Sequence, residues 1–133
     1  MAMKPRINDA QLREQRQREY NASQTLAARY PQVQELLLEL RFTEGDEVPL
    51  LSPYRQIFTG EMQAFFELRC PSRSCAGGGF DLGRAVDDAA RGRARSEGGR
   101  LFCRGVNTEG AGRGESCRVQ LSYGIEVVPL TPR

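Results

Sequence analysis

Two long stretches of the chain alternate apolar and polar residues, which is the period of a half-buried β-strand. In the first stretch, which starts at Val33, four apolar side chains share one face: Leu36, Leu38, Leu40 and Phe42. In the second, which Pro129 ends, the apolar face consists of Cys117, Val119, Leu121, Tyr123, Ile125 and Val127. The three consecutive leucines at 36–38 also permit a helix, but the alternation favours a strand in both stretches.

The first thirty residues have a helical period. We predict one helix over residues 1–30, with Asn8 or Asp9 as its N-cap and with Pro31 ending it. Its few apolar residues gather in the second half, so we expect solvated first turns and docked last turns. These apolar residues are Leu12, Tyr20, Leu26, Ala27 and Tyr30. An exposed terminal helix and a partner-binding arm both fit this pattern.

A second helix is predicted after a short strand at 80–82. Asp81 is its candidate N-cap, and Gly98 and Gly99 are its expected end. The apolar positions follow the i, i+3, i+4, i+7, i+8 rule, and they are Leu82, Ala85, Val86, Ala89 and Ala90. This narrow face rich in alanine predicts close packing against the sheet.

A long connection and several short strands are predicted in addition to the two long strands and the two helices. Residues 43–59 are expected to form a long connection packed along the sheet edge, because Pro49 and Pro53 break regular structure. Short strands are predicted at 64–70 and 99–106. The fold class that follows is α+β: an antiparallel sheet of about four or five strands with one packed helix and an N-terminal helix. We predict an N-terminal helical arm at 1–31 and an α+β zinc-binding domain at 32–133.

Four cysteines are the candidate chemistry of this chain: Cys70, Cys75, Cys103 and Cys117. They form two pairs at turns, separated by the second helix, and each lies at the end of a predicted strand. A tetrahedral thiolate site needs ligands that converge from distant parts of the chain in this way. A disulfide framework and four unrelated buried cysteines are the alternatives, and a reducing compartment favours metal.

The rest of the composition narrows the functions that are open. The chain has no histidine, so a Ser-His-Asp or Cys-His catalytic arrangement is excluded, and a protein metal site must use thiolates or carboxylates. Residues 1–21 lack the apolar region of a signal peptide, and no run is long and apolar enough for a membrane span. We therefore expect a cytoplasmic protein that has no membrane contact.

Residues 65–128, with their four cysteines, resemble a zinc ribbon, in which two cysteine-bearing hairpin ends surround one zinc ion. Both spacings within the pairs are longer than is usual there, and a helix lies between the pairs. In general build the chain also resembles small bacterial proteins. The zinc-ribbon resemblance implies a structural Zn²⁺ and a role in protein docking or nucleic-acid contact.

The function that we expect is a non-enzymatic interaction module stabilised by zinc, with a protein partner favoured. The alternative is nucleic-acid binding through the arginine-rich segment 84–118, although a net charge of +2 is small for a polyanion ligand. Its candidate residues are Arg84, Arg91, Arg93, Arg95, Arg104 and Arg113. A metal-dependent enzyme is a third possibility, with candidate carboxylates Asp81, Asp87, Asp88 and Glu67. Four thiolates leave such an enzyme no open coordination position.

Overall fold

The computed structural model describes residues 9–45, 48–50, 52–92, 96–110 and 113–130. Its centre is an antiparallel sheet of five strands, in the order β2-β1-β9-β7, with β3 paired to β1 beside β2. The strands are β1 (Val33–Glu44), β2 (Val48–Pro49), β3 (Tyr54–Thr59), β7 (Ser96–Phe102) and β9 (Val119–Pro129). The α+β class and the antiparallel sheet confirm the sequence prediction.

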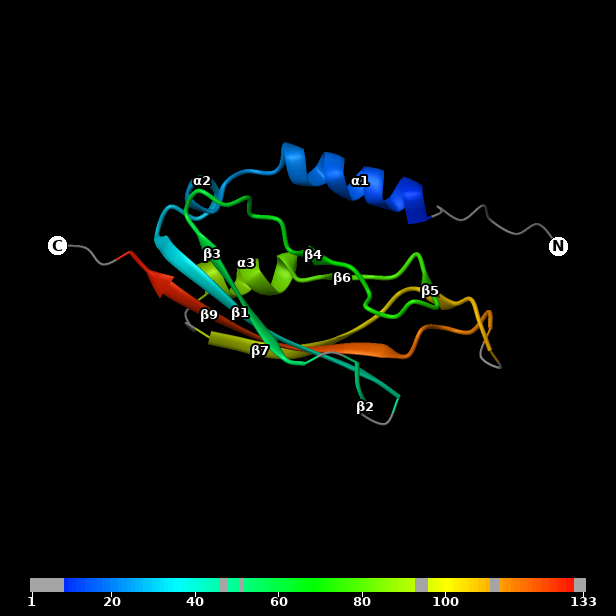
Figure 1. The fold of residues 1–133 in the computed structure, drawn as a ribbon. Coiled ribbons are helices and arrows are strands. Elements are labelled where there is room, and N and C mark those ends of the chain that lie inside the picture. Colours follow the sequence, from blue (N-terminus) through cyan, green and yellow to red (C-terminus); the bar gives the residue numbers. More distant parts are fainter. Residues whose placement is uncertain (1–8, 46–47, 51, 93–95, 111–112, 131–133) are drawn as a thin grey trace.

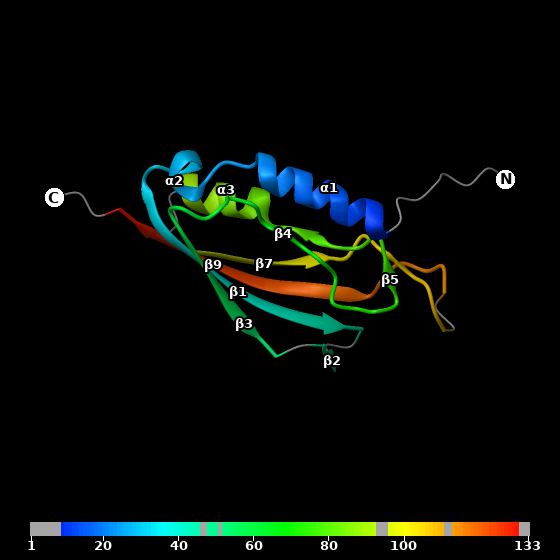
Figure 2. The same ribbon diagram turned by 45° about the horizontal axis from the view of Figure 1, so that its top comes forward.

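Two small two-stranded ladders and three helices complete the described fold. One ladder pairs β4 (Glu67–Leu68) with β6 (Phe80–Asp81), and the other pairs β5 (Cys75–Ala76) with β8 (Val106–Asn107). The helices are α1 (Asp9–Ala22), α2 (Leu26–Arg29) and α3 (Gly83–Arg91). All three lie on the same face of the main sheet, and none of them covers the opposite face (Figures 1 and 2). None of these helices is long and apolar enough to cross a membrane.

The hydrophobic core fills the space between the sheet and the helices. On β1 the four predicted apolar residues Leu36, Leu38, Leu40 and Phe42 are all buried. The neighbouring strand β9 contributes Val119, Leu121, Ile125 and Val127 to the same side of the sheet, and these residues are buried as well. Each fully buried leucine or isoleucine adds about 1.5–3 kcal/mol to the free energy of unfolding, so these two strands carry much of the core. From α3, Val86 and Ala89 close it.

The prediction of one continuous N-terminal helix is wrong, because the chain bends between α1 and α2. The hydroxyl of Thr25 caps α2 by accepting a hydrogen bond from the Ala28 amide, 3.2 Å away. The last turns dock as expected, since Leu26 and Tyr30 are buried in the core, whereas Tyr20 is exposed. Asn8 lies outside the described residues. The boundary between 31 and 32 stays a prediction.

Two other element boundaries differ from the prediction. The connection at 43–59 contains β2 and β3, and β3 pairs with β1 along six residues. The second helix ends at Arg91, because Gly92 is extended, and the two glycines expected to end it lie inside β7. The N-cap of this helix is Leu82 and not Asp81 as predicted. The Asp81 carboxylate nevertheless accepts a hydrogen bond from the Gly83 amide at 2.8 Å.

Candidate metal centre

The four cysteines meet beyond one end of the main sheet. Cys70 follows β4 and Cys75 lies in β5, whereas Cys103 follows β7 and Cys117 precedes β9. Segment 69–79 and the described residues of segment 103–118 therefore lie side by side, and we call this part of the molecule the cysteine end (Figures 1 and 2). Long-range strand pairing brings the ligands together, because β7 and β9 are neighbours in the sheet and β5 pairs with β8.

The sulfur atoms are spaced as a metal site requires. The Sγ atoms lie 3.8 Å apart in Cys70 and Cys117 and 3.6 Å apart in Cys75 and Cys103, and all four lie within 4.8 Å of one another. A tetrahedral ion with bonds of about 2.3 Å to sulfur separates its ligands by about 3.8 Å. All four are free thiols, and two of them are buried. The cluster therefore fits one tetrahedral metal ion.

Two glycines pack against the sulfur cluster where no larger residue fits. A Cβ atom at Gly78 would overlap the sulfur atoms of Cys75 and Cys103, and one at Gly105 would overlap the Cys75 sulfur and the Gly78 backbone. The Gly105 amide also donates a hydrogen bond to the Cys103 sulfur at 3.3 Å. Such amide donors stabilise a thiolate and orient it toward a metal.

Crowding of the four sulfurs spreads their pKa values apart. The pKa of Cys103 falls to about 5, because the thiol of Cys70 and the amides of Gly105 and Gly79 hydrogen-bond its thiolate. The pKa of Cys75 rises to about 12 through burial and its interaction with Cys103. The pKa of Cys70 also rises, because of its hydrogen bond to Cys103 and its burial. One thiolate forms readily, and a divalent cation would displace the remaining protons.

Arg16 of α1 is a residue at this site that the sequence prediction missed. Its guanidinium donates a hydrogen bond to the carbonyl of Gly78 at 2.8 Å, which ties α1 to segment 69–79 just after Cys75. A side chain at Gly79 would collide with this guanidinium, so the glycine allows the contact. The only signal in the sequence is that Leu12 and Arg16, four residues apart, share the half-buried face of α1.

Of the six arginines proposed for nucleic-acid contact, the four that the structure describes lie in two separate places. Arg84 and Arg91 are on α3, whereas Arg104 and Arg113 are at the cysteine end, which the figures show at a distance from α3 along the molecule (Figures 1 and 2). Arg93 and Arg95 lie outside the described residues. Arg91 is engaged locally, since it pairs with Asp87 at 2.8 Å and lies over the Tyr30 ring.

The candidate carboxylates do not converge on the cysteines. Asp87 accepts a hydrogen bond from the Tyr30 hydroxyl at 3.0 Å, and Asp88 is exposed on α3. Glu67 of β4 lies beside Glu19 of α1. Burial and the hydrogen bond and negative charge of Glu19 raise the pKa of Glu67 from 4.5 to about 6. The folded protein therefore holds this proton more tightly than the unfolded chain does.

This raised pKa gives a pH-dependent prediction. The contribution of Glu67 to stability is present below about pH 4.5 and is lost as the pH rises through about 6, where the carboxylate ionises beside Glu19. We expect Glu67→Gln to raise the thermal midpoint by about 1–3 °C at pH 7.5, with a smaller gain at pH 5.5; the gain is modest because Glu67 is only partly buried and solvent screens its charge. Glu44→Gln, which changes an exposed side chain at the end of β1, is the control. An equal gain at both pH values would contradict the coupling.

Comparisons with protein-family models, with curated proteins and with solved structures give no match for this chain.

Proposed function

We propose that this protein is a non-enzymatic interaction module in which one structural zinc ion, held as in a zinc ribbon, fixes the cysteine end. Zinc is the ion best suited to four sulfur ligands at tetrahedral spacing, because it has no geometric preference of its own and binds thiolates strongly. Four thiolates close the coordination sphere and leave no position for a substrate. The centre then serves to hold segments 69–79 and 103–118 together, next to the end of the sheet.

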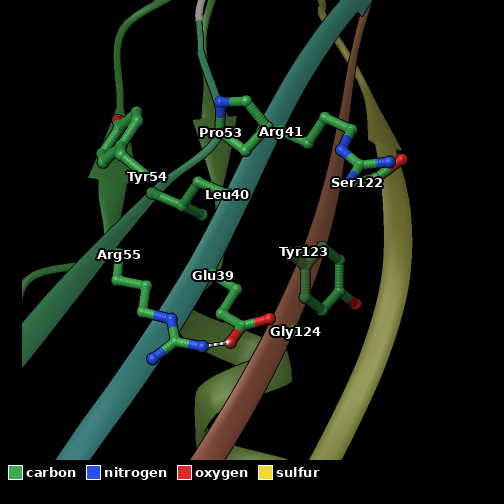
Figure 3. Close-up of a pocket in the computed structure, with 9 residues that line it drawn as sticks. All are labelled: Glu39, Leu40, Arg41, Pro53, Tyr54, Arg55, Ser122, Tyr123 and Gly124. Atoms are coloured by element: carbon green, nitrogen blue, oxygen red, sulfur yellow. Dashed lines mark ion pairs between the residues drawn. The ribbon is translucent and has the colours of Figure 1, made fainter.

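The open face of the main sheet is the observation that carries the docking function. This face points away from all three helices (Figure 2). The strand register places Phe102 and Ile57 on it, and these side chains are 64% and 51% exposed. A hollow of about 370 Å³ lies over its middle and extends to the loop before β3. Figure 3 shows its lining, in which the Arg55 guanidinium pairs with the Glu39 carboxylate at 3.0 Å across β3 and β1. Exposed aromatic, aliphatic and arginine side chains together are typical of protein interfaces.

The pattern of charges on this face suggests a second copy of the chain as the partner. In the register of the sheet, Glu126 lies beside Leu37 in one row of outward residues, and Arg41 lies beside Ser122 two rows away. The row between them contains Gly124 and Gly98 together with Arg55 and Glu39, whose opposite charges pair with each other. A second copy related by a two-fold axis that runs along this middle row would place its own Glu126 row over the Arg41 row of the first copy. A two-fold interface requires such self-complementarity.

Self-association tests this proposal. We expect sedimentation velocity from about 1 to 200 µM protein, in about 150 mM salt, to show a dimer that forms with increasing concentration. Ile57→Glu and Arg41→Glu should each weaken the dimer by more than about tenfold, because each places an uncompensated charge in the interface. Adding Glu126→Arg to Arg41→Glu should restore part of the affinity. Arg84→Glu, on the helix face, is the control with the same change in charge.

A monomer throughout this concentration range would contradict docking to a second copy, as would an equal effect of Arg84→Glu. The nucleic-acid alternative has less geometric support, because the described arginines of the segment 84–118 are spread over α3, β7 and the cysteine end. The enzyme alternative has less support as well, since Asp81 and Asp87 have structural hydrogen-bond partners.

A further inference from the structure

A small basic pocket lies on the helix face of the cysteine end, between α1 and the segment that carries Cys70 and Cys75. Its volume is about 130 Å³, and four arginines from two parts of the chain contribute to its walls. Arg13 and Arg16 come from α1, whereas Arg69 and Arg73 come from the cysteine segment. Ser72 adds a hydroxyl. The pocket is separate from the open face of the sheet, because α1 lies on the opposite side (Figure 2).

The local structure brings these arginines together. Arg13 and Arg16 are three residues apart on α1, so they share one side of the helix. The hydrogen bond from Arg16 to the Gly78 carbonyl holds that side against the cysteine segment. Arg69 immediately precedes the ligand Cys70, and Arg73 lies midway between the two ligands. A metal bound by Cys70 and Cys75 would therefore fix both of these arginines as well.

Within the part of the chain that the structure describes, no lining carboxylate balances the charges of this pocket. No acidic residue lines the pocket, and the two ion pairs among the described residues involve none of its arginines. The Nε atom of Arg16 is buried and has no hydrogen-bond partner. Glu67 does not line the pocket, but it lies close enough to Arg16 for that positive charge to act on its pKa. A divalent ion with four thiolates carries two net negative charges, against four positive guanidinium groups.

We propose that this pocket binds a phosphate group, present as inorganic phosphate or as the monoester of a small molecule. The volume suits one tetrahedral oxyanion, so the remainder of a monoester would lie outside the pocket. Guanidinium groups fork onto phosphate oxygens, and several of them around one dianion match its charge better than a carboxylate ligand would. The serine hydroxyl supplies a further donor for an oxygen atom.

Titration calorimetry of the zinc-loaded protein in a phosphate-free buffer of low salt tests this site. The probes are inorganic phosphate, a nucleoside monophosphate and a single-stranded oligonucleotide that has only diester phosphates. We expect saturable binding of inorganic phosphate or of the monophosphate, and we expect Arg69→Gln/Arg73→Gln to weaken it by at least about tenfold, since two charge-assisted contacts are lost. Arg13→Gln, on the other wall, should weaken it in the same direction. The matched control is Arg104→Gln/Arg118→Gln, which removes two exposed arginines of the cysteine end outside the pocket.

Zinc content and the circular dichroism spectrum show whether each variant has kept its fold. Failure of both small probes to bind would overturn the proposal, because the arginines would then serve only to offset the charge of the metal centre. Equal weakening in the pocket variant and in the control would overturn it too, since it would indicate a diffuse basic surface. Binding of the oligonucleotide alone would assign the charge to nucleic-acid contact. Self-association through the open face is measured separately, so the two proposals can fail independently.

Discussion

Replacing Cys117 with alanine is expected to abolish binding of the proposed zinc ion and to unfold the cysteine end. The side chain is buried and its sulfur lies 3.8 Å from that of Cys70, so its loss opens the cluster at the start of β9. Metal-binding energy is folding energy in a small domain, and we expect a loss of more than about 4 kcal/mol in the free energy of unfolding. Metal analysis of the reduced, untagged protein should find one zinc per chain before the substitution and much less after it.

Ser116→Ala is the matched control for this prediction, because it truncates the exposed neighbouring side chain and leaves all four thiols in place. Its zinc content and thermal midpoint should stay close to those of the original protein. The prediction is wrong if the reduced protein binds no stoichiometric zinc. It is equally wrong if Cys117→Ala keeps its metal and melts within about 2 °C of the original, a shift too small for the loss of a structural ion.

Gly105→Ala is expected to damage the metal centre although it changes no ligand. The added methyl group would overlap the Cys75 sulfur and the backbone of Gly78, so the ligands must move apart. It would also displace the amide that hydrogen-bonds the Cys103 sulfur. Disturbing groups that support metal ligands typically costs about 10- to 100-fold in affinity, and the steric overlap places our expectation at the upper end. Competition with a chromogenic zinc chelator measures this change.

The control for this substitution is Gly124→Ala in β9. A Cβ atom there makes an ordinary contact of 3.9 Å with that of Glu39 and lies far along the strand from the cysteines. Zinc affinity should change by less than about twofold, since no ligand contact is involved. If Gly105→Ala bound zinc as tightly as Gly124→Ala, the close packing of backbone around the sulfurs would not be required for the site.

Local sequence patterns were reliable where an element is long and one of its faces is buried. The alternation around Leu38 predicted β1, and that around Leu121 predicted β9, because a period of two residues has no other regular solution over such a length. The alanine-rich face of α3 was also predicted correctly, and Val86 and Ala89 are buried. In these elements, burial and local preference agree.

Element ends were less predictable, because contacts with other elements decide them. Thr25 starts a new helix where the sequence pattern continues, and Gln63 helps to hold the bend by donating to the Ser23 carbonyl at 2.7 Å. Gly98 and Gly99 looked like a helix end, but β9 recruits them into β7, where Gly99 leaves room for the Tyr123 ring. Neither Gln63 nor Tyr123 is local to the element that it shapes.

The sequence by itself determined the two central strands, the α+β class and the four thiols that a metal site would use, because these depend on short-range periodicity and on side-chain chemistry. Only the tertiary structure decided which sulfurs are neighbours: Cys70 meets Cys117 and Cys75 meets Cys103, so each close pair joins the two sequence pairs. It also decided that Arg16 reaches Gly78 across 62 residues. Such contacts follow from strand pairing and helix docking, and a one-dimensional pattern contains no information on which distant segments become neighbours.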